Sequence, residues 1–269
     1  MEGTNRNSAR TNNRNEGALK TLNKKIPFEP HGFFYQYCNN NKCRQITVLL
    51  KPLPRLATER EIEAFTHVIK QSSTPGVILQ YPDPDVIIAI KIASDGAQET
   101  KESPWGPFLK YLHTLQVAHE QNSGLSECAN YKHEPLRAGN WKSAEEDVVF
   151  SNHARTVPGV RHIDTDGAYH CTNCLDVLFL VEASSDGCPG TPMENKYKAT
   201  TMTRKVAEHL GAIPLLIQHH YADEEHQHPC YLTSWKNGSP KRYARTWDRL
   251  VEDFENYRER HSAECSSGH

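Results

Sequence analysis

Hydrophobic and polar positions along the chain follow two different periods, which predicts a mixed α/β protein. Short apolar runs rich in β-branched residues have the length of strands, and they occupy 45–50, 77–81, 86–92, 176–182, 213–219 and 230–235. Apolar residues at helical spacing predict amphipathic helices over 58–72, 105–115, 141–150, 200–210 and 247–257. The first helix starts with Thr58-x-x-Glu61, the signature of a capping box. Weaker patterns predict strands at 160–163 and 192–197.

The polar segments between these elements suggest how the chain is divided. Residues 1–25 contain six Asn and six Lys or Arg but almost no large apolar side chains, so we expect a disordered, mildly basic tail. An α/β region of unknown role is expected over 26–120 and a second domain over 140–261, with a short disordered tail at 262–269. No internal repeat is evident in the sequence.

Charge and composition narrow the classes of function. The chain has 31 Lys and Arg against 33 Asp and Glu, which excludes a globally basic nucleic-acid coat and requires any anion site to be local. No apolar stretch approaches the ~18 residues of a membrane helix, and the N-terminus lacks the apolar region of a signal peptide. Eight scattered cysteines are too sparse for a disulfide scaffold, so we expect an intracellular protein of the cytoplasm or nucleus.

One pair of strands carries residues suited to metal chemistry. Asp176 begins a strongly apolar strand, and Glu194 and Lys196 lie two residues apart on a later strand, on the same face. If these strands pair antiparallel, two carboxylates and one ammonium converge at a sheet edge. Carboxylates bind Mg²⁺ or Mn²⁺, and the metal polarises a phosphoryl oxygen and activates a water. The alternative is that Asp176 caps its strand and the other two residues face solvent.

The order of elements around this motif resembles the PD-(D/E)XK nuclease superfamily. Asp176-x17-Glu194-x-Lys196, set between a helix and a further helix and strand, is similar to the restriction-endonuclease-like αβββαβ core, over about 141–220. The resemblance implies a metal-dependent nuclease, with DNA as the favoured substrate. It implies that Asp176 and Glu194 bind the metal and that Lys196 is the catalytic lysine. Glu146 and Gln218 stand where members have auxiliary groups.

Two close cysteine pairs form a second candidate site. Cys38-x4-Cys43 and Cys171-x2-Cys174 could together supply the four ligands of a structural zinc ion joining the two halves of the chain. Separate reduced thiols near turns are the alternative.

A basic, aromatic segment follows the candidate nuclease core. Five basic residues lie among Trp235, Tyr243 and Trp247, and they are Lys236, Lys241, Arg242, Arg245 and Arg249. Basic groups beside flat rings suit phosphate contact and base stacking, although a solvated loop leading into a helix explains the same pattern. The sequence therefore predicts either a nuclease or a non-catalytic nucleic-acid- or protein-binding module stabilised by zinc. It leaves open whether the chain is a homodimer.

Overall fold

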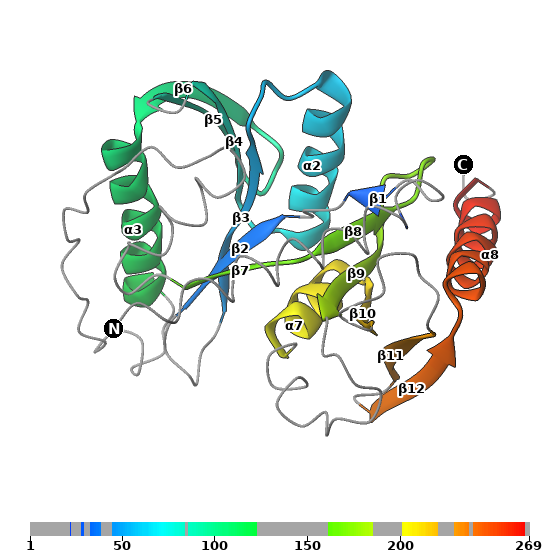
Figure 1. The fold of residues 1–269 in the computed structure, drawn as a ribbon. Helices are drawn as coiled ribbons and strands as arrows, with labels where there is room; N and C mark the ends of the chain where they lie inside the picture. The colour runs from blue at the N-terminus through cyan, green and yellow to red at the C-terminus, as the bar shows by residue number, and fades with distance from the viewer. Residues whose placement is uncertain are drawn as a thin grey trace. The chain divides into compact units, whose positions relative to one another are not determined.

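The chain forms two compact units in a computed structural model that describes residues 22, 28–29, 33–38, 45–83, 86–122, 161–184, 201–219, 229–236 and 239–266. The first unit comprises Met1–Gly32 and Thr165–His269, and the second comprises Phe33–Asp164. Each unit contains one six-stranded mixed sheet with helices beside it (Figure 1), so the predicted α/β class is confirmed. No helix in these ranges is long and apolar enough to cross a membrane.

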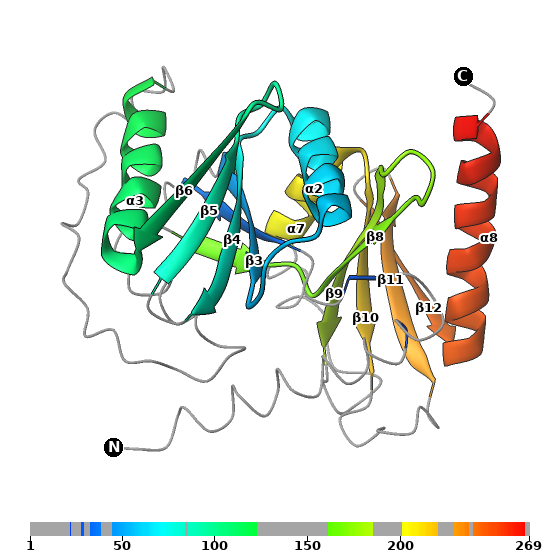
Figure 2. The ribbon, with the colours of Figure 1, turned by 90° about the horizontal axis from the view of Figure 1, so that it is seen from above.

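The second unit has the strand order β6-β5-β4-β3-β2-β7. Strands β3 and β4 are parallel and joined by α2, whereas the other neighbouring strands are antiparallel. Helices α2 and α3 lie on opposite faces of this sheet (Figure 2). Its elements are β2 (Phe34–Tyr37), β3 (Ile46–Leu53), α2 (Glu59–Ser72), β4 (Gly76–Asp83), β5 (Val86–Ile92), β6 (Gln98–Pro104), α3 (Trp105–Asn122) and β7 (Arg161–Asp164).

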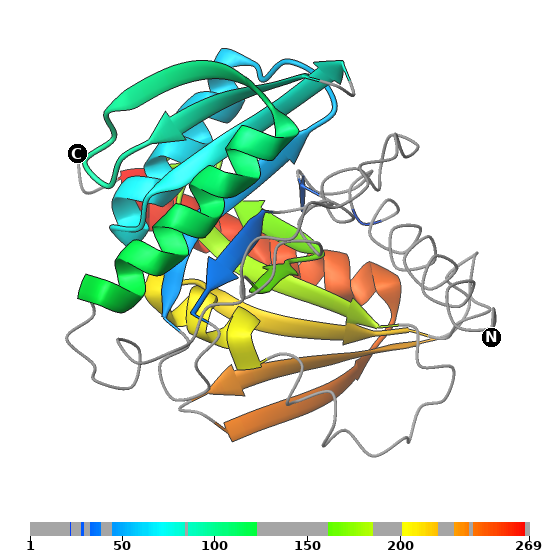
Figure 3. The same cartoon turned by 90° about the vertical axis from the view of Figure 1, so that its left-hand side faces the viewer.

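The first unit has the strand order β1-β8-β9-β10-β11-β12. Here β9 and β10 are the parallel pair, joined through α7, and the other neighbours are antiparallel. Figure 3 shows α7 in front of this sheet and α8 behind it. Its elements are β1 (Phe28–Glu29), β8 (Gly167–His170), β9 (Val177–Ser184), α7 (Thr201–Leu210), β10 (Ile213–Gln218), β11 (Cys230–Lys236), β12 (Ser239–Arg245) and α8 (Trp247–Ser266).

The two units share one fold, although no repeat is evident in the amino-acid sequence. In each, an antiparallel strand pair leads through a crossover helix to a parallel strand, which is the first of a three-stranded antiparallel meander, and a final helix follows. The first strand pair even has a register shift at the same place, between Gln36 and Tyr37 in one unit and between Tyr169 and His170 in the other.

Matching residues support this equivalence. In the strand after the crossover helix, pairing with the parallel neighbour ends at a buried glutamine, Gln80 in one unit and Gln218 in the other. The next residue lies against the tryptophan that begins the final helix, and the ring centroids are 5.9 Å apart for Tyr81 and Trp105 and 6.3 Å apart for His219 and Trp247. We infer that the chain contains a duplicated fold.

The structure corrects three sequence-based boundaries. The units divide at 164/165 rather than within 121–139, because β7 pairs with β2 of the second unit. Residues 262–266, predicted to be a tail, continue α8. Leu22, predicted to be disordered, is a buried member of the first unit's core. The predicted helix over 141–150 and strand over 192–197 lie outside the described residues.

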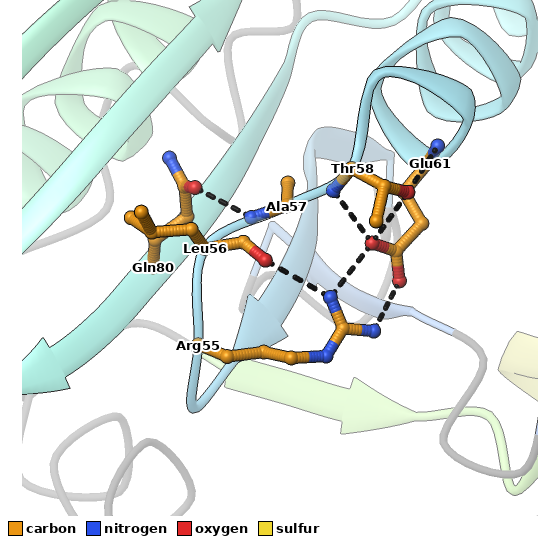
Figure 4. A network of polar contacts seen from close by, with 6 residues as sticks. All are labelled: Arg55, Leu56, Ala57, Thr58, Glu61 and Gln80. Atoms are coloured by element: carbon orange, nitrogen blue, oxygen red, sulfur yellow. Dashed lines mark hydrogen bonds and ion pairs between the residues drawn. The ribbon is translucent and has the colours of Figure 1, made fainter.

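The N-terminus of α2 shows how local sequence positions an element. Thr58 and Glu61 form the predicted capping box, in which Thr58 N–H donates to Glu61 Oε2 at 2.8 Å and Glu61 N–H donates to Thr58 Oγ1 at 3.3 Å (Figure 4). The guanidinium of Arg55 donates hydrogen bonds to both oxygens of the Glu61 carboxylate, at 2.7 and 2.8 Å. Ala57 N–H donates to Gln80 Oε1 at 2.7 Å, which ties the loop before the helix to β4.

We expect Glu61→Gln to remove a pH-dependent part of the stability. Hydrogen bonds from Arg55, opposed by burial and supplemented by Thr58, lower the pKa of Glu61 from 4.5 to about 2. Because the folded pKa is lowered, the stabilisation is present above pH 4.5 and is lost as the pH falls toward 2. Since Arg55 is largely exposed, we expect about 1–2 kcal/mol. Denaturant unfolding at pH 7 and pH 3 measures it, and equal pH dependence in parent and variant would contradict the assignment.

Candidate metal centre

Two segments far apart in the sequence bring four metal-ligating side chains together in the first unit. Cys171 and Cys174 lie in the turn that joins β8 to β9, and His261 and Cys265 lie near the end of α8. The α8 pair is four residues apart, so both side chains project from one face of the helix. A Cys-x2-Cys turn facing a His-x3-Cys helix is a ligand arrangement of structural zinc sites.

The distances between the ligand atoms fit a tetrahedral ion. All four atoms lie within 4.8 Å of one another. The Sγ atoms of Cys171 and Cys265 are 3.8 Å apart, and Cys174 Sγ is 3.3 Å from His261 Nε2. Tetrahedral zinc with Zn–S of ~2.3 Å and Zn–N of ~2.0–2.1 Å places two sulfurs about 3.8 Å apart and a sulfur and a nitrogen about 3.5 Å apart. The residues therefore fit zinc.

Backbone hydrogen bonds fix the cysteine turn. Cys171 N–H donates to Asp176 O at 2.9 Å, and Leu175 N–H donates back to Cys171 O at 3.1 Å. Leu175 itself has φ of 67°, a left-handed conformation that closes the turn. The ring Nδ1 of His170 lies 3.2 Å from Leu175 O. The two thiols are thus held in position by local structure.

Side chains around the ligands join the turn to the last turns of α8. Ser262 Oγ lies 3.7 Å from Cys171 Sγ, and Ser262 O accepts a hydrogen bond from Cys265 Sγ at 3.4 Å. Asn173 Nδ2 donates to Ser266 Oγ at 3.3 Å. A metal ion bound here would cross-link the hairpin to the end of the helix.

The two cysteines of the turn differ electrostatically. Burial and the nearby Asp176 carboxylate raise the pKa of the Cys174 thiol to about 12. Burial also opposes ionisation of Cys171, but hydrogen bonds from the backbone of Cys174 and Asn173 outweigh it and lower the pKa of that thiol. Zinc binds thiolate, so metal binding displaces the proton of Cys174.

Two of the four predicted zinc ligands belong to this cluster. Cys171 and Cys174 belong to the cluster, but their partners come from α8 rather than from Cys38 and Cys43. Cys38 belongs to the other unit, where it is buried, and Cys43 lies outside the described residues. Cys38 is the counterpart of Cys171 in the repeated fold, because its N–H donates to Gln45 O at 2.8 Å across the equivalent turn. The His-x3-Cys spacing was the signal for the missing ligands.

The predicted nuclease residues do not form one site in the described part of the chain. Asp176 borders the metal cluster, with Oδ2 3.8 Å from His261 Nε2. Gln218 pairs with Ser184 at the far end of β9, eight residues from Asp176 and so roughly 26 Å away along the strand. Glu146, Glu194 and Lys196 lie outside the described residues.

The sheet also corrects the expected strand neighbours. Along Phe179–Val181, β9 pairs with β8 on one side and with β10 on the other. Both edges of this part of β9 are therefore taken by β8 and β10, and the predicted strand with Glu194 and Lys196 lies outside the described residues. The described residues supply two antiparallel strands, a helix and a parallel strand, and the rest of the predicted αβββαβ core lies outside them.

The predicted basic patch is distributed over different faces. Since side chains alternate along a strand, Lys241 and Arg245 lie on the face of the sheet that α8 covers, and Arg242 lies on the other. Arg245 and Arg249 both form ion pairs with Asp253, at 2.7 and 3.2 Å. Lys236 ends β11, and its side chain lies outside the description.

Comparison with known proteins adds no assignment. No known protein family, no curated protein and no solved structure matches this chain. The features of the molecule that bear on function are the metal-ligating cluster and the basic and aromatic residues of the first unit.

Proposed function

We propose that this protein is a nucleic-acid-binding module whose first unit is stabilised by a structural zinc ion. The observation that carries the proposal is the Cys171, Cys174, His261 and Cys265 cluster, whose atoms lie within 4.8 Å of one another. Four protein ligands fill a tetrahedral zinc, which leaves no position for substrate and is typical of structural rather than catalytic sites.

The place of the cluster explains how zinc supports a binding surface. Helix α8 follows β12 almost directly, with Thr246 between them. Zinc bound at the C-terminal end of α8 would fix the helix to the turn between β8 and β9. The N-terminal end of α8 is joined to β12, so fixing the helix would also restrain the β11–β12 edge of the sheet. Aromatic and basic residues gather on that edge, including Trp235 beside Arg204 and Tyr231 beside Arg242. DNA is the polymer that the sequence resemblance favours.

Removal of the metal tests this function. We expect purified protein to hold about one equivalent of zinc at this site, and we expect a chelator to remove it together with affinity for DNA. Elemental analysis and fluorescence anisotropy with labelled oligonucleotides measure both, and added zinc should restore binding. Protein that is free of zinc as purified, or that binds DNA equally after chelation, would contradict the proposal.

Metal-dependent phosphodiester hydrolysis is a second candidate, favoured by a different pair of carboxylates. Asp166 Oδ2 accepts a hydrogen bond from Ala183 N–H at 2.6 Å, so it lies beside Glu182. Glu182 Oε1 accepts a hydrogen bond from Thr203 of α7. This is the end of β9 at which Gln218 lies. Neighbouring carboxylates are the ligands that Mg²⁺ prefers.

The same preparation separates the two candidates. The protein is incubated with plasmid, linear duplex and single-stranded DNA in Mg²⁺, Mn²⁺ or EDTA. Cleavage that requires the metal and is lost in Glu182→Gln and in Lys196→Ala would support the hydrolase. Zinc-dependent binding without cleavage would support the binding module.

A further inference from the structure

Among the buried polar atoms of the first unit that lack a hydrogen-bond partner within the part of the chain that the structure describes, three belong to neighbouring residues of α7, β11 and β12. They are Arg204 Nε, Thr233 Oγ1 and Arg242 Nε. Thr233 is completely buried. A buried donor left without an acceptor destabilises the folded state, and more so if the donor is charged. Such atoms therefore point to an acceptor that binds from outside.

The three residues lie on one face of the sheet, the face that α7 covers. Thr233 pairs with Arg242 on β12 and with Leu216 on β10, so all three side chains share that face. Arg204 projects from α7, and its guanidinium carbon lies 5.2 Å from the centroid of the Trp235 ring. Since Trp235 and Thr233 are two residues apart on β11, they point to the same face. Arg204, Thr233 and Arg242 therefore form one row.

Aromatic rings position both guanidinium groups. The guanidinium carbon of Arg242 lies 4.2 Å from the centroid of the Tyr231 ring, and Arg204 lies over Trp235 in the same manner. A ring against its flat face orients a guanidinium while leaving the N–H groups at its edge able to donate. The Thr233 hydroxyl lies on the strand between the two rings.

The neighbouring arginines show what is unusual about this pair. Arg245, Arg249 and Arg258 each contact a carboxylate of α8. Among the described residues, no carboxylate and no hydrogen-bond acceptor contacts the guanidinium of Arg204 or Arg242. The three paired arginines are neutralised by carboxylates of α8, whereas the positive charges of Arg204 and Arg242 remain available to an anion.

We propose that Arg204 and Arg242, which lie on either side of the buried Thr233 hydroxyl, bind successive phosphate groups of a single-stranded nucleic acid. This inference rests on the proposed binding function and names its contact surface. The row presents donors, which selects an anion, and arginine matches the geometry of phosphate oxygens. Tyr231 and Trp235 are four residues apart, roughly 13 Å along β11, so the two guanidinium groups reach beyond one phosphate. Partly buried donors favour a flexible single strand over a rigid duplex.

The test replaces the two arginines and keeps a matched control. Binding of labelled single-stranded and duplex oligonucleotides is measured over a range of salt concentration for the parent, Arg204→Gln/Arg242→Gln and Arg249→Gln. For single-stranded DNA, losing two phosphate contacts should reduce the slope of log affinity against log salt by about 1.4. Arg249→Gln should keep the parental slope, since its charge is already paired. Arg204→Lys/Arg242→Lys should keep the slope while weakening binding, because it retains the charges without the planar fork.

Zinc content separates this inference from the proposed function. A double glutamine variant that keeps its zinc and shows the reduced slope of log affinity against log salt supports the phosphate row. Parental affinity and slope in that zinc-loaded variant would overturn the row while leaving the binding module intact. Failure of zinc-loaded parent protein to bind any oligonucleotide would overturn both, and binding of a polyglutamate peptide instead would assign the row to an acidic protein partner.

Discussion

Replacing Cys174 by serine is expected to remove zinc from the first unit and to lower its stability by about 4 kcal/mol when free zinc in the parent sample is a thousand times the dissociation constant. The hydroxyl is a poor zinc ligand, and three remaining groups cannot hold the ion as tightly. The last turns of α8 should loosen first, because Ser262, Cys265 and Ser266 contact the turn that the metal fixes.

Paired histidine variants provide the control. His261→Gln removes a ligand, whereas His209→Gln changes an exposed histidine on α7 that does not belong to the cluster. Only the first should lose zinc by elemental analysis and should unfold at lower denaturant concentration. If Cys174→Ser and His261→Gln keep the parental zinc content, the four residues do not form a metal site.

The sequence predicted the longer elements that bury an apolar face, and it missed the short buried strands β2 and β8 and two exposed edge strands. The helix beginning at Glu59 was confirmed because its apolar residues repeat at helical spacing, and the strands over 76–83 and 86–92 because each contains an apolar, β-branched run of strand length. Strands β6 (QETKESP) and β12 (SPKRYAR) are edge strands exposed along most of their length. Their residues do not alternate in polarity, so only pairing with the neighbouring strand defines them.

The last turns of α8 were missed for a related reason. Ser262–Ser266 contains no large apolar residue, so its composition predicted a tail. In the structure these residues continue the helix and approach the cysteine turn. These residues carry no apolar stripe, and sequence periodicity cannot detect a helical turn without one.

The candidate sites show where spacing stops being informative. Cys171 and Cys174 were found because both ligands belong to one turn. Their partners lie about 90 residues away, at separations of 87 between Cys174 and His261 and 94 between Cys171 and Cys265, and only the strand order and the path of α8 bring them close. The same limit applies to Asp176, because the strand that follows it has β8 and β10 as its neighbours. The Cys-x2-Cys spacing identified two metal-ligating residues, whereas the fold of the first unit determines which residues of α8 lie beside them.

Replacing Phe254 by alanine is expected to destabilise the first unit by about 3–5 kcal/mol, the range for truncating a buried phenylalanine. Phe254 is 2% exposed, and its ring stacks on Phe179 and Tyr169 with centroids 4.9 and 5.9 Å apart. The variant would leave a cavity between α8 and the sheet and would also lose the aromatic contacts. Zinc cannot compensate, since the metal fixes only the far end of the helix.

Denaturant unfolding with saturating zinc measures this loss. Glu252→Ala on the same helix is the control, because Glu252 forms only an exposed ion pair with Arg249 at 2.9 Å, and removing such a pair costs about 0–1 kcal/mol. If Phe254→Ala unfolds as the control does, the metal alone attaches α8 to the unit. If it unfolds much earlier while keeping its zinc at low denaturant, the aromatic core supplies most of the attachment. The second outcome is expected, because a single cross-link at one end of a 20-residue helix leaves its other turns to be held by side-chain contacts.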